Sequence, residues 1–278
     1  MYRLLATDID DTLLAPDGAL PEANRAALVA LHRAGVAIVF CSGRADVSIR
    51  SVARTIIRPD DDEYLIAYNG ARIVTADSRR VVVEHNVESR AIASVMAYAR
   101  EHALYVQGYD ADRFVVEQES DRTAAYARST GMDFRVVDDL VVALRSGSPK
   151  LIVIDDHDRL VSHKPVLDRL GTEFGFATVF SKSTYLEIVR TGVHKGAALR
   201  ELAGVLGIGI EQTIAIGDSG NDVEMIRAAG LGLAVASARD EAKAAATVVL
   251  DARAEDGALA EVVARYFPEI DAGGGSAG

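Results

Sequence analysis

The chain has 278 residues, 49% of them hydrophobic, and its 41 acidic and 30 basic residues give a formal net charge of −11. Domains run to roughly 100–200 residues, so this length allows one large or two moderate domains with a sizeable core. The acidic balance excludes nucleic acid and anionic membranes as expected partners, and a single cysteine, Cys41, excludes an intramolecular disulfide.

The first quarter of the chain alternates strand and helix signals. No long apolar segment follows Met1 and no charge-free apolar run reaches about 18 residues, so we expect a cytoplasmic protein. Apolar runs predict strands at residues 4–7, 36–41 and 64–67, and helical spacing predicts helices over 21–35 and 45–56. Strand–helix–strand connections of this length predict a parallel sheet.

The pattern changes between residues 71 and 190. A hairpin is expected over 72–84, and amphipathic helices over 87–103 and 158–174. Further short strands are expected at 114–116, 151–154 and 185–189. This part of the chain is interpreted as a separate α+β unit inserted into the first domain.

The first pattern resumes after residue 195. Helices to residue 206 and over 223–229 alternate with strands at 213–216 and 231–236. The Gly/Ala/Ser-rich tail, 271–278, is predicted to be disordered. We therefore expect a doubly wound, mostly parallel α/β core made by residues 1–83 and 189–270, with residues 84–188 as the inserted domain.

An acidic cluster, Asp8-Ile9-Asp10-Asp11-Thr12, directly follows the first predicted strand. Alternation along an extended chain places Asp8 and Asp10 on one side. Ligands of parallel α/β sheets bind beyond the carboxyl ends of the strands, where this cluster lies. An acidic turn that caps a helix would have the same composition, so this motif alone leaves both interpretations open.

A second acidic cluster, Gly217-Asp218-Ser219-Gly220-Asn221-Asp222, also directly follows a predicted strand. A glycine turn with an Asp/Asn helix cap is its structural explanation. Carboxylates gathered from both clusters repel each other, by about 4 kcal/mol for two charges ~4 Å apart at an effective dielectric of 20. Magnesium, with its preference for carboxylate, water and phosphate oxygens, would remove that penalty. The sequence has no cluster of cysteines and histidines that would indicate zinc.

Two further elements could hold a phosphate. Ser42-Gly43-Arg44 follows the strand at 36–41, and its hydroxyl and amides could bind phosphate oxygens. Lys195 lies at the predicted start of a helix, where its charge could serve a phosphate and a nucleophile. A loop serine and an exposed lysine are the ordinary alternatives. Cys41 ends the same strand and is interpreted as a small buried hydrophobe rather than a catalytic thiol.

These four elements, in this order, resemble the motifs of the haloacid dehalogenase (HAD) superfamily of phosphotransferases. The resemblance extends to Tyr68-Asn69-Gly70 and Leu186-Glu187-Ile188, which together with the large insertion resemble the Cof-type branch. It spans residues 1 to about 267 and implies a Rossmann-like core with an inserted α+β cap domain. Many members of the family have glycine at the position of Asp11, where the extra charge could tune Asp10 or simply face solvent.

The resemblance implies a role for each motif residue. Asp8 would be the nucleophile that becomes phosphorylated, and Asp10 would protonate the leaving oxygen and later deprotonate water. Ser42 and Lys195 would complete the catalytic set. Phosphate or substrate binding would fall to Thr12, Gly43, Asn69 and Asn221. Mg²⁺ would be held by Asp8, the Asp10 backbone carbonyl, Asp218 and Asp222.

The expected function is therefore hydrolysis of a small phosphorylated metabolite, such as a sugar phosphate, through an aspartyl-phosphate. A phosphomutase with the same nucleophile and a metabolite-binding homologue without catalysis stay open, as does the oligomeric state. A receiver domain is disfavoured because receivers are about half this length. Substrate choice should lie in the insertion. Lys150, Lys182 and Arg190 are candidates to reach substrate, although we expect them to be ordinary surface charges.

Overall fold

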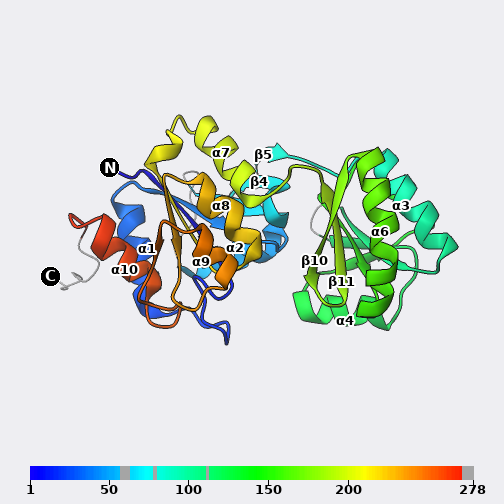
Figure 1. Ribbon diagram of the computed structural model, residues 1–278, viewed down its shortest axis with the longest axis horizontal. Helices are drawn as coiled ribbons and strands as arrows, with labels where there is room; N and C mark the ends of the chain where they lie inside the picture. The colour runs from blue at the N-terminus through cyan, green and yellow to red at the C-terminus, as the bar shows by residue number, and fades with distance from the viewer. Residues whose placement is uncertain (57–62, 78–79, 111–112, 271–278) are drawn as a thin grey trace. The chain divides into compact units, whose positions relative to one another are not determined.

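A computed structural model describes residues 1–56, 63–77, 80–110 and 113–270. The disorder predicted for 271–278 falls outside these residues. The chain divides into two units, one formed by Met1–Val83 with His194–Gly278 and the other by Glu84–Val193. Figure 1 shows this division by colour: blue, cyan and yellow-to-red segments build the first unit, and green segments build the second.

The first unit contains an eight-stranded sheet with the order β14-β13-β12-β1-β2-β3-β4-β5. The pairs from β14 to β3 are parallel, and β4 is antiparallel to β3. This is the mostly parallel α/β core that the sequence predicts. The strands are β1 (Leu4–Asp8), β2 (Ala37–Cys41), β3 (Tyr64–Ala67), β4 (Arg72–Thr75), β5 (Val81–Glu84), β12 (Thr213–Gly217), β13 (Leu231–Ala234) and β14 (Val248–Val249).

Helices of the first unit pack in pairs against this sheet. Helix α1 packs on α10, and α7 packs on α8. Leu4 and Ala6 of β1 share one buried apolar cluster with Leu199 of α7. Every residue of β1 is buried, as expected for a strand covered on both faces. The helices are α1 (Glu22–Arg33), α2 (Asp46–Ile56), α7 (Lys195–Val205), α8 (Val223–Ala228), α9 (Asp240–Ala245) and α10 (Ala258–Tyr266).

The second unit is a separate mixed sheet with the order β10-β11-β9-β6-β7-β8. Its strand pairs are antiparallel except β7 with β8. A buried apolar cluster joins the strands to α3 and α6. The elements are α3 (Ser89–Glu101), β6 (Tyr105–Asp110), β7 (Arg113–Val116), α4 (Asp121–Thr130), β8 (Phe134–Val136), α5 (Leu140–Ala143), β9 (Leu151–Ile154), α6 (His157–Phe174), β10 (Phe176–Lys182) and β11 (Tyr185–Arg190).

The second unit differs from the sequence-based expectation in its C-terminal bound and in three of its strands. The insertion was expected to end at 188, whereas β11 pairs with β10 as far as Arg190 and the unit runs to Val193. Strands β6, β8 and β10 are not among the predicted strands. Strands β8 and β10 lie at the two edges of the sheet, and β10 leaves side chains such as Val179 exposed. Among the described residues, no helix is both long and apolar enough to cross a membrane.

Candidate active site

The predicted site residues lie where four neighbouring parallel strands end. Asp8 is the last residue of β1, Ser42 follows β2, the turn Tyr68–Gly70 follows β3, and Asp218 follows β12. Strand β1 lies between β2 and β12, where the order of the strands reverses. Open α/β sheets bind their ligands at such a switch point, beyond the carboxyl ends of the strands.

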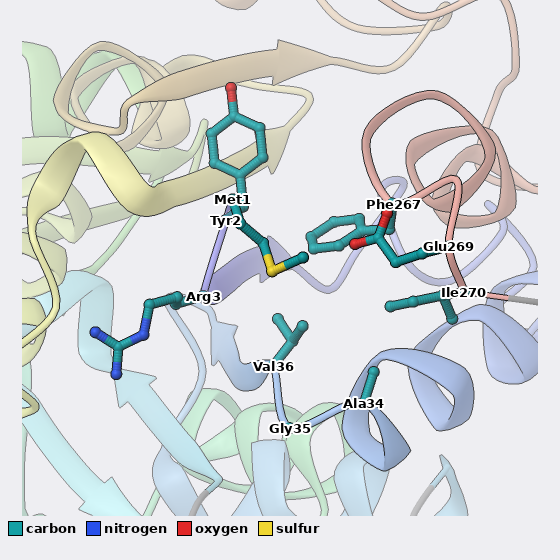
Figure 2. A pocket seen from close by; sticks show the side chains of 9 residues that line it. All are labelled: Met1, Tyr2, Arg3, Ala34, Gly35, Val36, Phe267, Glu269 and Ile270. Carbon is teal, nitrogen blue, oxygen red and sulfur yellow. The ribbon is translucent and has the colours of Figure 1, made fainter.

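A small cavity lies at the opposite end of β1. Its volume is about 170 Å³, and Figure 2 shows its mostly apolar lining, with Tyr2 and Phe267 among the side chains around it. Arg3, which also lines it, immediately precedes β1, whereas Asp8 ends that strand. The cavity therefore contains none of the predicted site residues, and the chemistry points to the carboxyl ends of the strands instead.

Lys195 is the centre of the candidate site. Its Nζ donates to Asp8 Oδ1 at 2.5 Å and to Asp222 Oδ1 at 2.6 Å, and no more than 7% of any of these three side chains is exposed. Lys195 begins helix α7, whose positive dipole end disfavours an ammonium group. The two carboxylates offset that repulsion, so Lys195 is not the exposed helix lysine of the ordinary alternative.

Burial and like charges perturb these groups. Burial and then Asp222 raise the pKa of Asp8 well above its usual value, although Lys195 opposes the change. Burial and Asp222 also raise the pKa of Asp218 to about 6. Burial alone would lower the pKa of Lys195, but Asp222 and Asp8 outweigh it and raise that pKa. The cluster thus has three carboxylates for one ammonium, an excess that a divalent cation could neutralise.

Oxygen atoms of Asp8, Asp218 and Asp222 lie within 4.8 Å of one another. An all-carboxylate set with room for water and phosphate suits a hard cation such as Mg²⁺. The two oxygens of Asp222 already have partners, because Oδ1 faces Lys195 while Oδ2 accepts from the amides of Asp218 and Ser219, both at 3.1 Å. Asp8 and Asp218 are therefore the better-placed direct ligands.

The loop after β12 is shaped by a close backbone approach. A Cβ on Gly217 would lie 2.5 Å from the Cβ of Asp222, so a side chain cannot be accommodated there without displacing the carboxylate. Across the site, Thr12 Oγ1 donates to Asp218 Oδ1 at 3.3 Å. This contact joins the loops that follow β1 and β12.

Asp10 lies apart from the carboxylate cluster and pairs with Arg44. Arg44 Nε donates to Asp10 Oδ2 at 2.9 Å, and Nη2 donates to Oδ1. The Arg44 backbone amide also donates to Ser42 Oγ at 3.2 Å. The sequence motif Ser42-Gly43-Arg44 contained this arginine, but the spacing carried no signal that it would reach Asp10.

Asn69 and Asn221 connect two further loops. Asn221 Nδ2 donates to Asn69 Oδ1 at 3.0 Å, and Ser219 Oγ donates to Asn221 Oδ1 at 2.7 Å. The amide of Asn69 lies beside Gly43, where an added Cβ would be 3.0 Å from its Nδ2. Three of the four residues predicted to bind phosphate or substrate, Gly43, Asn69 and Asn221, are thus brought together from the loops after β2, β3 and β12.

Two single residues are explained by the structure. Asp11 adopts a left-handed backbone with φ of 59°, the region that glycine favours, and its side chain is exposed. Glycine would adopt this conformation without strain. Cys41 is buried, and burial raises the pKa of its thiol, which agrees with its interpretation as a small hydrophobe.

The expectation for one side chain of the second unit was wrong. Lys150 is not an ordinary surface charge: its Nζ donates to Glu187 Oε1 at 2.7 Å, and both side chains are almost fully buried. Lys182 lies over the ring of Tyr185, 5.0 Å from the centroid, and Arg190 is exposed as expected.

Comparisons with known proteins agree with this geometry. A family model described as haloacid dehalogenase-like hydrolase matches residues 5–262. The chain is 30% identical over 256 residues to "Putative phosphatase YxeH" of Bacillus subtilis (strain 168), covering 88% of this chain and 92% of that protein. It is also 30% identical over 239 residues to HMP-PP phosphatase of Cronobacter sakazakii (strain ATCC BAA-894), covering 86% and 85%.

Solved structures show the same fold. TM0651 from Thermotoga maritima is 30% identical and gives a TM-score of 0.86, with 95% of this chain and 97% of that chain covered. A haloacid dehalogenase-like hydrolase from Bacteroides thetaiotaomicron is 26% identical and also gives a TM-score of 0.86, with 95% and 99% covered.

Proposed function

The chain belongs to the haloacid dehalogenase-like hydrolase family and is a phosphatase of that family, and we propose that it hydrolyses a small phosphorylated metabolite through an aspartyl-phosphate. One observation carries the proposal: buried Lys195 bridges Asp8 and Asp222 at the switch point of the sheet. One relative is named HMP-PP phosphatase, which supports a small phosphorylated substrate for this chain.

The proposed reaction has two steps. In the first, a carboxylate oxygen of Asp8 attacks phosphorus, the bond from phosphorus to the leaving oxygen breaks, and Asp10 protonates that oxygen. In the second, water attacks phosphorus, Asp10 takes a proton from the water, and the bond to Asp8 breaks to release phosphate. Lys195 keeps Asp8 ionised for the attack and, with Ser42, binds phosphoryl oxygens.

The remaining motif residues position these groups. Thr12 orients Asp218, and Asn221 and Asn69 hold two loops around the phosphoryl site. Gly43 leaves room for the amide of Asn69. Phosphoryl transfer needs little covalent help from a protein, so most of the rate acceleration comes from such positioning and from charge.

The proposed cofactor is Mg²⁺. The side chains of Asp8 and Asp218 and the backbone carbonyl of Asp10 would hold it, and Asp222 would support the set through its contacts with Lys195 and the loop amides. A bound divalent cation supplies charge neutralisation of the phosphoryl oxygens during transfer. It would also offset the excess negative charge of the carboxylates.

The test is phosphate release from a panel of sugar phosphates and other small phosphates, in magnesium and in EDTA. Asp8→Asn keeps the shape of the side chain and removes the nucleophile, so release should vanish. Asp251→Asn is the matched control, because the Asp251 side chain is 89% exposed. Magnesium-dependent release that persists in Asp8→Asn would contradict the mechanism, and phosphate returned to the sugar would indicate a mutase.

A further inference from the structure

Two hydrogen bonds hold the backbone of Arg44. Its backbone amide donates to Ser42 Oγ at 3.2 Å, and its carbonyl accepts from the amide of Tyr68 at 2.9 Å. The side chain extends from this anchor to Asp10, which it contacts through Nε at 2.9 Å and through Nη2. The loop that follows β2 therefore binds the side chain of Asp10, 34 positions earlier in the chain.

The guanidinium of Arg44 binds both carboxylate oxygens of Asp10, a contact called the fork below. A planar guanidinium that binds both oxygens of a carboxylate sets the orientation of the carboxylate plane, which the single ammonium of a lysine cannot do. The Asp10 side chain is 52% exposed and that of Arg44 38%, so the rest of each group faces solvent. Without the fork, an exposed aspartate would rotate among its rotamers.

The two steps of the proposed reaction use Asp10 differently. The first requires a carboxylic acid that donates a proton, and the second requires a carboxylate that accepts one from water. A carboxylate paired with an arginine fork offers only acceptor lone pairs. The geometry seen here therefore matches the second step.

We propose that Arg44 is a positioning residue that orients the Asp10 carboxylate as the base of the second step. This inference rests on the proposed function. In that step the water oxygen forms a bond to phosphorus, the bond from phosphorus to the Asp8 oxygen breaks with its electron pair going to Asp8, and the water proton goes to Asp10. The products are inorganic phosphate, free Asp8 carboxylate and protonated Asp10, which then supplies the proton for the next leaving group.

The test uses Arg44→Gln and Arg44→Lys with p-nitrophenyl phosphate and magnesium. General-base catalysis contributes on the order of 10²–10⁴-fold, so losing the orientation should lower kcat by roughly 10–100-fold. The loss of orientation should slow the second step and leave the first unchanged, so phosphoenzyme should accumulate. Nitrophenol should then appear in a burst, and KM should fall together with kcat. Arg44→Lys should lie between wild type and Arg44→Gln.

Two controls separate the outcomes. Arg265→Gln removes another exposed arginine that pairs with an aspartate of the same unit, and it should leave kcat unchanged. Asp10→Asn should trap phosphoenzyme if Asp10 is the base. The Arg44 proposal is overturned if Asp10→Asn traps phosphoenzyme and neither Arg44 variant does, or if the Arg44 variants raise KM at unchanged kcat. If no variant forms phosphoenzyme, the proposed function itself fails.

Discussion

Replacing Lys195 by methionine removes an ammonium group while keeping a side chain of similar length. In the wild-type protein this ammonium is fully buried and donates to Asp8 and Asp222, which are themselves buried. Methionine would leave both carboxylates in the interior without a cation. The variant thus measures how strongly the candidate site depends on its central charge.

The expected loss is large. Removing one partner of a buried ion pair costs about 3–5 kcal/mol, since the remaining charge is left uncompensated. Domain stabilities are about 5–15 kcal/mol, so the first unit should lose a large part of its free energy of unfolding. Because burial already raises the pKa of Asp8, protonation at lower pH should relieve the penalty. The loss should therefore be smaller at pH 5 than at pH 7.5.

The assay is hydrogen exchange of the β1 amides in EDTA, which reports opening of the first unit rather than of the whole chain. Arg227→Met is the matched control in the same unit. Arg227 pairs with Glu224 at 3.0 Å on an exposed helix face, where a pair contributes about 0.2–1 kcal/mol. If Lys195→Met loses no more stability than Arg227→Met, the buried cluster is not held together by this lysine and the reasoning is wrong.

Three further changes test other parts of the site. Asp11→Gly should be more stable than Asp11→Ala by about 1–2 kcal/mol in urea unfolding, because the left-handed φ of 59° penalises a Cβ, and equal stability would contradict that backbone. Gly217→Ala should cost about 1–3 kcal/mol and weaken magnesium binding in calorimetry, since its Cβ would meet Asp222 at 2.5 Å. Gly204→Ala, where a Cβ meets nothing within 4 Å, is the control and should lose neither stability nor magnesium affinity. The raised pKa of Asp218, about 6, means that the folded metal-free protein binds more protons than the unfolded chain between about pH 4 and 6. Thermal midpoints in EDTA should therefore fall as pH rises through that range, whereas magnesium should stabilise increasingly because a ligand carboxyl must be ionised. If the thermal midpoint changes with pH in the same way with and without magnesium, the expected link between ionisation of Asp218 and magnesium binding is refuted.

The sequence by itself predicted where the candidate site lies. Acidic and polar motifs directly follow apolar runs, and in a parallel α/β core the ends of neighbouring strands meet at one edge. That rule was enough to predict that Asp8, Ser42 and Asp218 would lie together, because both strand formation and the position of a motif after a strand are local properties. The all-oxygen composition of the cluster likewise predicted a hard divalent cation from residue types alone.

The tertiary structure decided which atoms meet. Lys195 is 187 positions from Asp8, and their contact depends on the order of the strands and on the packing of α7, which no local pattern encodes. The fork between Arg44 and Asp10 depends in the same way on the neighbouring positions of β1 and β2. Local patterns in the sequence therefore specify strands and the residues that follow them, whereas the partners of buried charges follow from contacts that form only when distant strands pair.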